Sequence, residues 1–184
     1  AKNGDSLMLV APSDHVIPDA EGFRGTVEAA APTALAGQIV TFGIRPDRAE
    51  TGYGWLELTA RAAEGSPPTP LPLKSFIEKP DAETAEALLS SGMHLWNAGI
   101  FLFSTSTILQ AFAEYAPETL AGVRGAHSAA ETDLGFTRLA AEPWSKLEDI
   151  SIDYAVMERA PNLSVMPYSG AWSDLGDWQA IWRE

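Results

Sequence analysis

Short apolar runs alternate with segments of helical periodicity along this chain. The first apolar run, residues 7–10, is followed at once by Pro12 and small polar residues, which predicts a strand buried on both faces that stops abruptly. A helical pattern then extends from Asp19 to Leu35, and the β-branched run at residues 38–44 predicts the next strand. Strand, helix and strand in this order predict a right-handed βαβ unit with parallel strands.

The predicted helix carries its own start and stop signals. Asp19 can cap its N-terminus, and Gly37 ends the pattern. Pro32 interrupts it, and because proline inside a helix kinks or restarts it, two short segments fit the pattern as well as one. Apolar residues that recur at i, i+4 form the stripe expected to pack on the sheet: Phe23, Val27, Ala31 and Leu35.

The middle of the chain predicts two more strands. Residues 45–54 form a polar loop with paired glycines, where backbone can approach a ligand, although glycines serve turns more often. Residues 55–60 alternate as a half-exposed strand does, and residues 73–80 resume a strand after a proline-rich surface turn at 65–72.

The second half of the chain is mostly helical in pattern. A helix begins at Asp81 and ends at Gly92, with Ala85, Leu88 and Leu89 on one face. An apolar strand at 100–103 leads to Ser104 or Thr105, either of which can cap a helix with Ile108, Phe112 and Tyr115 as its buried stripe. The remaining predictions are a helical region at 117–150, a short capped helix at 151–158, a strand at 162–167 and a helix that begins near Asp177. Together these elements predict one mixed α/β layer structure.

Composition supports a folded, single-domain chain. With 184 residues, 46% of them apolar and six tryptophans, the chain can bury a sizeable core. No apolar run approaches the roughly 20 residues that cross a bilayer, and the N-terminus has no signal-peptide pattern. The absence of cysteine excludes disulfides, thiol nucleophiles and cysteine-ligated zinc, and it fits a cytoplasmic enzyme. Both ends are abrupt, so we expect a piece of a longer protein.

The net charge of −13 argues against a nucleic-acid surface, because binding to a nucleic-acid backbone needs clustered Lys and Arg. The same charge opposes a phosphorylated ligand, which would need a divalent metal or basic residues outside this segment. Asp14 follows the first strand directly, and ligands bind at the carboxyl ends of strands in open α/β sheets. A carboxylate there can bind Mg²⁺, although aspartate also commonly caps turns.

Five groups of short motifs occur in one order along nearly the whole chain: APSDHVI at 11–17; FGI at 42–44 with ETGYG at 50–54; FIEKP at 76–80; WNAGIF at 96–101; and SIDYAVME at 151–158 with WSDLGDW at 172–178. Each motif is weak alone, but the ordered set resembles the nucleotidyltransferase domain of mannose-1-phosphate guanylyltransferases. The resemblance implies a Rossmann-like fold with a mixed, mostly parallel open sheet and flanking helices. Residues 1–184 would be the C-terminal portion of a single nucleotidyltransferase domain that is truncated on its N-terminal side.

The resemblance also implies roles for particular residues. Asp14 and Asp174 match the two aspartates that hold Mg²⁺ over the phosphates, and we expect them to converge. Gly54, Glu78, Lys79 and Asn97 match the sugar-phosphate pocket, with Lys79 directed towards phosphate and Asn97 able to donate and to accept. Taken singly, Glu78 and Lys79 could equally be a surface pair, Asn97 could close a turn, and His15 favours a structural hydrogen-bonding role.

The implied reaction joins GTP and mannose 1-phosphate to give GDP-mannose and pyrophosphate, and it requires alignment and charge neutralisation rather than a side-chain nucleophile. Three departures from the family pattern stand out. The glycine-rich signature loop with Arg and Lys is missing, Ala98 replaces a usual Ser, and Asp177 replaces another. Alternatives are another sugar-phosphate nucleotidyltransferase, such as a glucose-1-phosphate thymidylyltransferase, or a non-catalytic homologue that binds sugar phosphate or a partner subunit. Exposed apolar surface left by the missing strands would favour a homo-oligomer.

Overall fold

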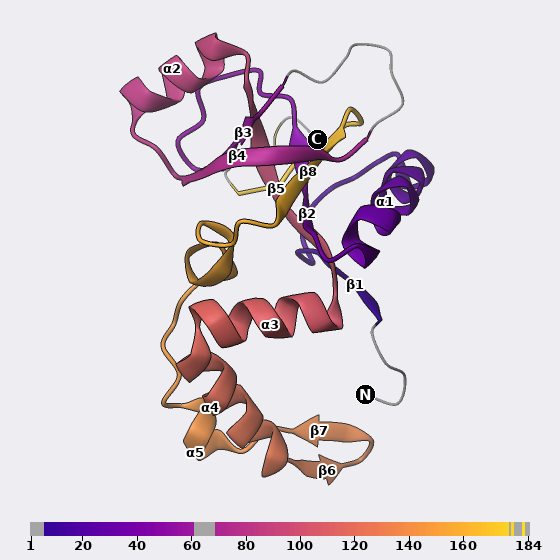
Figure 1. Cartoon of the computed structure of the whole chain (residues 1–184), viewed down its shortest axis with the longest axis vertical. Coiled ribbons are helices and arrows are strands. Elements are labelled where there is room, and N and C mark those ends of the chain that lie inside the picture. The colour runs from indigo at the N-terminus through magenta and orange to yellow at the C-terminus, as the bar shows by residue number, and fades with distance from the viewer. Residues whose placement is uncertain (1–5, 61–68, 177, 179–181, 183–184) are drawn as a thin grey trace. The chain divides into compact units, whose positions relative to one another are not determined.

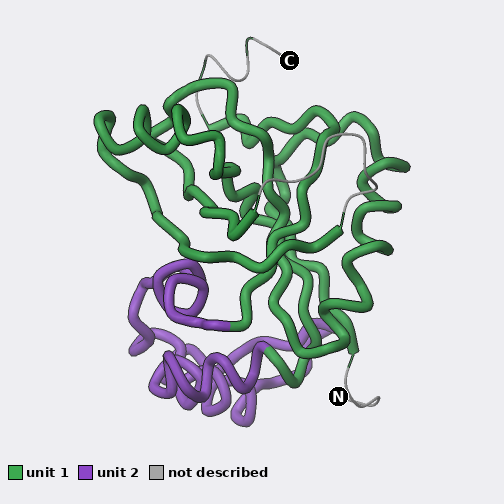
Figure 2. Tube along the Cα trace, turned by 45° about the horizontal axis from the view of Figure 1, so that its top comes forward, with its two compact units in different colours: residues 1–107, 162–184 green, residues 108–161 purple. Residues whose placement is uncertain are grey.

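The computed structural model describes residues 6–60, 69–176, 178 and 182. The chain divides into two compact units, which Figure 2 colours separately. The first contains Ala1–Thr107 and Asn162–Glu184, and the second contains Ile108–Pro161. The prediction that residues 1–184 belong to a single nucleotidyltransferase domain stays a prediction, and the two units are described in turn.

The first unit is built on a mixed six-stranded sheet (Figure 1). Its strands are β1 (Leu7–Val10), β2 (Ile39–Ile44), β3 (Gly54–Leu58), β4 (Leu71–Glu78), β5 (His94–Ser104) and β8 (Leu163–Tyr168). Their order is β1-β5-β2-β8-β4-β3, and β3 also pairs with β5, so that five strands form a partly closed ring.

The expectation of a mostly parallel sheet is wrong. Among the pairings of the described strands, only β2 with β8 is parallel. β1 and β2 do point the same way, as a βαβ unit requires, because both run antiparallel to β5, but β5 lies between them. The apolar pattern of a strand reports its burial and not its direction, so this insertion left no signal in the pattern.

β1 is a strand as predicted, but it is not buried on both faces. Met8, Leu9 and Val10 are 41%, 46% and 39% exposed, since β1 ends the strand order and pairs only with β5 among the described strands. β3 deviates in the opposite sense. It was predicted to be half exposed, yet Trp55, Leu56 and Leu58 are buried because β3 lies between β4 and β5 with apolar clusters on both faces.

Helix α1 (Ala20–Leu35) packs against β5, β2 and β8 (Figure 1). Asp19 caps it as predicted, accepting a hydrogen bond from the backbone N–H of Gly22. The structure resolves the alternative at Pro32, because one continuous helix contains this residue. Phe23, Val27 and Ala31 contact the core, whereas Leu35 in the last turn is 62% exposed.

Helix α2 (Ala82–Ser91) also follows the prediction. Asp81 accepts from the N–H of Thr84, and Gly92 adopts a left-handed conformation at the C-terminus. The strand predicted at 100–103 is the second half of β5, which extends back to His94. A hydroxyl caps the next helix, α3 (Thr105–Tyr115), since Ser104 Oγ accepts from the N–H of Thr107.

The second unit contains most of α3 and the elements that follow it. These are α4 (Pro117–Ser128), β6 (Glu131–Asp133), β7 (Phe136–Arg138), α5 (Ala141–Trp144) and the π-helical turn η1 (Asp153–Met157). The prediction that residues 117–150 are helical is therefore wrong in part, because β6 and β7 form a hairpin. The turn places Leu134 and Gly135 at positive φ. Hairpin turns of this geometry usually have Asn or Asp before Gly, so the leucine at this position gave no indication of a hairpin.

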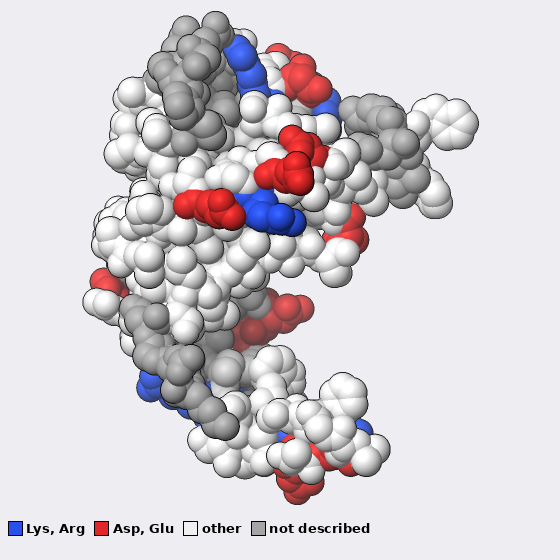
Figure 3. Space-filling view, turned by 90° about the vertical axis from the view of Figure 1, so that its right-hand side faces the viewer, with Lys and Arg blue, Asp and Glu red and all other residues white. Residues whose placement is uncertain are grey.

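Some sequence predictions concern residues that the structure does not describe. Residues 65–68, the first half of the proline-rich turn, and the helix start near Asp177 lie outside the described residues. Within the described part of the chain, no helix is long and apolar enough to cross a membrane. On the face drawn in Figure 3, acidic and basic side chains lie next to one another in places and no broad basic surface is visible, in keeping with the net charge of −13.

Candidate functional site

Three segments of the first unit leave the sheet at the same edge. β1 and β2 run antiparallel to β5, and β8 runs parallel to β2, so these three strands end on one side. Residues 11–17 follow β1, residues 45–53 follow β2 and residues 169–176 follow β8. The carboxyl edge of such strands is the usual ligand-binding position in α/β sheets.

The segments that carry Asp14 and Asp174 lie side by side. Val16 and Ser173 form an antiparallel bridge, with N–H···O distances of 2.9 Å from Val16 and 3.1 Å from Ser173. Burial lowers the pKa of His15, and the carboxylates of Asp174 and Asp14 both oppose that shift, so both charges act on this imidazole. The two segments thus lie side by side, while the convergence of the two carboxylates on one metal ion stays a prediction.

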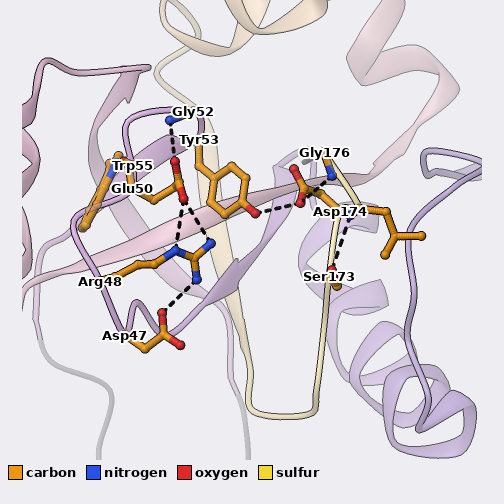
Figure 4. Close-up of polar contacts among 10 residues, drawn as sticks. Asp47, Arg48, Glu50, Gly52, Tyr53, Trp55, Ser173, Asp174 and Gly176 are labelled. Carbon is orange, nitrogen blue, oxygen red and sulfur yellow. Dashed lines mark hydrogen bonds and ion pairs between the residues drawn. The ribbon is translucent and has the colours of Figure 1, made fainter. Parts of the chain in front are cut away.

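Asp174 is held by a tyrosine from a distant part of the chain (Figure 4). The hydroxyl of Tyr53 donates to Asp174 Oδ1 over 2.7 Å, and the N–H of Gly176 donates to the same oxygen over 3.2 Å. Burial raises the pKa of Tyr53, and the hydrogen bond to Asp174 and its negative charge raise it further. The phenol therefore stays protonated and donates, and the two hydrogen bonds to Oδ1 fix the orientation of the Asp174 carboxylate.

The Tyr53 ring sits in a group of aromatic side chains. It meets Trp96 edge-on at a centroid distance of 5.3 Å and Trp172 at 5.4 Å. Trp172 in turn contacts His15, and its indole N–H donates to His15 Nδ1 over 3.3 Å. The hydrogen-bonding role favoured for His15 is thus present in the structure.

Arg48, in the loop after β2, contacts both the aromatic rings and the acidic side chains near Tyr53. Its guanidinium carbon lies 4.8 Å from the centroid of Trp96 and 5.8 Å from that of Tyr53, within cation–π range. Its Nη1 contacts Asp47 at 3.0 Å, and its Nε and Nη2 contact Glu50 Oε2 at 3.1 and 3.0 Å (Figure 4). The loop is therefore held by a network that the sequence analysis did not assign to the site.

The signal for these residues was present but ambiguous. Tyr53 and Trp96 stand beside Gly54 and Asn97 inside the quoted motifs, and Trp172 precedes Asp174 by two positions. Aromatic residues in such motifs serve cores as often as sites, and only the tertiary structure shows that these three meet. Ala98, a departure from the family pattern, is 1% exposed and belongs to the core.

Gly54 and Glu78 are paired across β3 and β4. A Cβ atom on Gly54 would lie 2.7 Å from Glu78 Oε2, so only glycine allows this carboxylate its position. Lys79 follows with a φ of 46° and donates its N–H to the carbonyl of Tyr53 over 3.2 Å. Its Nζ lies 3.5 Å from Glu78 Oε1, and its side chain is 60% exposed.

Asn97 lies in β5 opposite Gly43, where the register with β2 shifts between Thr41 and Gly43. Its Oδ1 accepts from Thr41 Oγ1 at 2.7 Å and from the N–H of Gly99 at 3.2 Å. Gly99 has a φ of +66°, which favours glycine. All six residues singled out by the sequence therefore belong to the first unit. Tyr53 contacts two of them, because its hydroxyl donates to Asp174 and its carbonyl accepts from the N–H of Lys79.

The donor set suits a magnesium ion that is shared with a substrate. No group of three or more His, Asp or Glu side chains that could hold a metal occurs in the part of the chain that the structure describes. Mg²⁺ commonly binds through one or two carboxylates, with phosphate oxygens and water completing its shell. Asp14 and Asp174, in adjacent segments at the carboxyl edge, fit that pattern.

Comparison with known proteins gives a consistent result. Residues 1–184 match the nucleotidyl transferase family. The chain is 42% identical over 179 residues to a mannose-1-phosphate guanylyltransferase of Escherichia coli (strain K12), covering 97% of this chain and 37% of that protein. It therefore spans well under half the length of the curated relatives that it matches.

Two solved structures have a similar fold. A Helicobacter pylori protein described as mannose-6-phosphate isomerase superposes with a TM-score of 0.82 at 30% identity, covering 94% of this chain and 65% of that one. A Thermus thermophilus protein described as mannose-1-phosphate geranyltransferase gives a TM-score of 0.80 at 32% identity, with coverages of 96% and 49%.

Proposed function

Because the chain belongs to the nucleotidyl transferase family, we propose that it carries the sugar-phosphate part of a site that makes GDP-mannose and pyrophosphate from GTP and mannose 1-phosphate. The single observation that supports this most is the identity of about 40% to mannose-1-phosphate guanylyltransferases along 97% of the chain. The family resemblance inferred from the motifs is confirmed at that level. The substrates are a proposal, since the relatives are much longer than this chain.

In this proposal the six candidate residues have separate roles. Glu78 accepts hydrogen bonds from sugar hydroxyls, Asn97 contacts the sugar, and Gly54 lets the backbone approach it. Lys79 places a positive charge near the phosphate. Asp14 and Asp174 would hold Mg²⁺, which neutralises phosphate charge when bound. Catalysis would then come from alignment and electrostatic stabilisation.

The charge of the chain makes a metal or further basic groups necessary. With 25 acidic and 12 basic residues, the chain as a whole repels a nucleoside triphosphate. The glycine-rich loop with Arg and Lys that grips the triphosphate in the family does not occur in these 184 residues. We therefore expect the isolated chain to bind mannose 1-phosphate but to make little GDP-mannose.

The experiment compares Asp14→Asn and Asp174→Asn with Asp149→Asn, an exposed carboxylate of the second unit, in the longest natural polypeptide that contains this chain. Product is measured with GTP and mannose 1-phosphate over a range of Mg²⁺ concentrations. Each of the first two changes should reduce turnover at least about a hundredfold and leave the thermal midpoint near that of the parent, because the carboxylates serve the ion rather than the core. Asp149→Asn should leave turnover unchanged.

Three outcomes would contradict the proposal. Turnover with dTTP and glucose 1-phosphate in place of the proposed pair would favour the thymidylyltransferase alternative. Absence of turnover with any nucleotide, together with tight binding of sugar phosphate, would favour the non-catalytic homologue. Full activity of both aspartate variants would remove the magnesium assignment.

A further inference from the structure

The imidazole of His15 is held in one tautomer by Trp172. The indole N–H of Trp172 lies 3.3 Å from His15 Nδ1, and an indole N–H can only donate. Nδ1 therefore accepts, so it carries no proton. A neutral imidazole has one acceptor nitrogen and one N–H group, which places the proton of His15 on Nε2.

The Nε2–H group of His15 is a donor that the protein leaves for another molecule. It has no hydrogen-bond partner among the described residues, where Trp172 is the partner of the other ring nitrogen. His15 is half-buried rather than enclosed, so an outside acceptor can reach it. The structural role favoured for His15 from the sequence therefore accounts for only one of its two nitrogens.

His15 adjoins the residues proposed to hold Mg²⁺. It follows Asp14 directly, and the next residue, Val16, is bridged to Ser173, which precedes Asp174. The negative charges of Asp174 and Asp14 both act on the ring. An anionic acceptor beside these carboxylates needs a cation, which Mg²⁺ held by the two aspartates would supply.

The same ring adjoins the part of β5 that carries Asn97. A Cβ atom on Gly99 would lie 3.9 Å from His15 Cε1, the ring carbon bonded to both nitrogens. Gly99 in turn donates its N–H to Asn97 Oδ1 over 3.2 Å. The imidazole thus lies near both the proposed sugar contact and the proposed metal carboxylates. In a sugar 1-phosphate bound to a metal, the phosphate is the group that joins these two parts.

We propose that His15 is a substrate-binding residue whose Nε2–H donates to a phosphate oxygen of mannose 1-phosphate. This inference rests on the proposed function and adds a residue to its site. Phosphate oxygens accept hydrogen bonds, so they match a nitrogen that only donates. A phosphate of GTP offers the same chemistry, but the position of the ring beside the Asn97 segment favours the sugar phosphate.

The test measures binding of mannose 1-phosphate to the purified 184-residue chain by calorimetry, at a fixed Mg²⁺ concentration and about pH 8, where a histidine is neutral. His15→Gln and His15→Asn are matched variants, because the amide nitrogen of glutamine reaches the position of Nε2 and that of asparagine only the position of Nδ1. We expect His15→Gln to stay within about threefold of the parent and His15→Asn to bind roughly tenfold or more weakly, the loss typical of a hydrogen bond to a charged group. His127→Gln, at an exposed position of α4, should bind as the parent does.

A purely structural role of His15 predicts the opposite order. The side-chain oxygen of asparagine at position 15 can still accept from the indole N–H of Trp172, so His15→Asn would preserve binding better than His15→Gln. Circular dichroism and thermal melting establish that each variant is folded under the binding conditions.

Nitrogen-15 NMR of the imidazole in the parent chain tests the donor without any substitution. We expect the chemical shifts of the Nε2–H tautomer before ligand is added, and a shift of the Nε2 resonance on addition of mannose 1-phosphate. Mannose, which lacks the phosphate, should leave that resonance in place. An Nδ1–H tautomer, or an equal response to mannose, would overturn the inference.

The outcomes separate the two proposals. If the parent chain binds no mannose 1-phosphate, the proposed function fails, and this inference fails with it. If the parent binds but His15→Asn binds as tightly as His15→Gln, or the loss occurs only in a parallel titration with GTP, only the inference is overturned. A selective loss of mannose 1-phosphate binding in His15→Asn supports both.

Discussion

The hydroxyl of Tyr53 and the carboxylate of Asp174 meet at 2.7 Å, although 121 positions separate them in the sequence. This contact joins the loop after β2 to the segment after β8. It gives the proposed metal-binding carboxylate a partner that is itself packed between Trp96 and Trp172. Asp174 is therefore oriented by Tyr53, the neighbour in sequence of Gly54, which belongs to the proposed sugar-phosphate pocket.

Tyr53→Phe should impair the use of Mg²⁺ more than it impairs folding. The variant keeps the ring contacts and loses one hydrogen bond to a charged group, which is worth about 1.5–3 kcal/mol in such settings. We expect the Mg²⁺ concentration for half-maximal turnover to rise about tenfold or more in the longest polypeptide that contains the chain. Tyr154→Phe, at a 48% exposed position of the second unit, is the control. An unchanged Mg²⁺ dependence in Tyr53→Phe would show that Asp174 needs no such partner.

Gly54→Ala should disturb the position of Glu78. The new methyl group would lie 2.7 Å from Glu78 Oε2 and 3.0 Å from the ring of Phe76, so both must move. Overpacking of this kind typically costs about 1–3 kcal/mol of stability, and we expect weaker binding of mannose 1-phosphate as well. Gly25→Ala, where nothing lies within 4 Å of the added atom inside α1, should instead stabilise the chain by about 0.5–1 kcal/mol. Urea unfolding and calorimetry measure the two effects, and equal behaviour of the two variants would refute the steric argument.

Stability should fall as the pH drops below about 6.5, in part because of His94. Burial lowers the pKa of His94 in the folded state below its ordinary value of 6.5, although the charge of Glu57 partly opposes the shift. The unfolded chain then binds more protons than the folded one, so the free energy of unfolding is lost on acidification, by up to about 1.4 kcal/mol per pH unit for one group. Burial of His15 acts with the same sign on the pKa of that residue.

Urea unfolding of the parent, His94→Asn and His127→Asn at about pH 8, 7, 6 and 5.5, which spans the ordinary histidine pKa, checks this prediction. His94→Asn should be less stable at the highest pH and should lose less stability on acidification than the parent. His127, exposed in α4, should be dispensable for the effect. An identical pH dependence in the parent and His94→Asn would contradict it.

The exposed strand β1 should make the chain self-associate. Met8, Leu9 and Val10 present apolar side chains on a strand whose described pairing is with β5 alone, and such edges accept further strands. Sedimentation velocity over a range of concentrations should show a growing share of larger species. Leu9→Lys should shift the distribution towards monomer, because lysine on an edge opposes pairing. A monomer at all concentrations in the parent would exclude this surface as an interface.

The sequence predicted the elements better than their arrangement. Two helices begin and end where they were predicted to. Asp19 and Asp81 cap their starts, and Gly37 and Gly92 follow their ends, because caps are local interactions that neighbouring residues encode. The position of β5 between β1 and β2 depends on contacts between distant segments, and no local pattern records it. Leu134 in a tight turn shows the same limit at short range, since its positive φ is imposed by the hairpin rather than preferred by leucine.

The candidate site divides in the same way. The motifs proposed six site residues, and all of them lie in the first unit: Asp14, Gly54, Glu78, Lys79, Asn97 and Asp174. The residues that hold them, Thr41 for Asn97 and Tyr53 for Asp174, act over 56 and 121 positions in the sequence. An aromatic or hydroxyl side chain in a strand or loop has many ordinary uses, so only the fold reveals which polar group it supports.

The pairing of β5 with three other strands makes some parts of the site more rigid than others. β5 is bonded to β2 along much of its length, to β3 at one end and to β1 at the other, so exposing its amides requires several ladders to open together. Tyr53 and Asp174 lie in segments tied down mainly by side chains and single backbone bridges. If the proposed sugar phosphate binds here, Asn97 would therefore lie in the more rigid part of the site and Tyr53 and Asp174 in the more mobile part. Any closing movement on binding would then be made by the segments after β2 and β8.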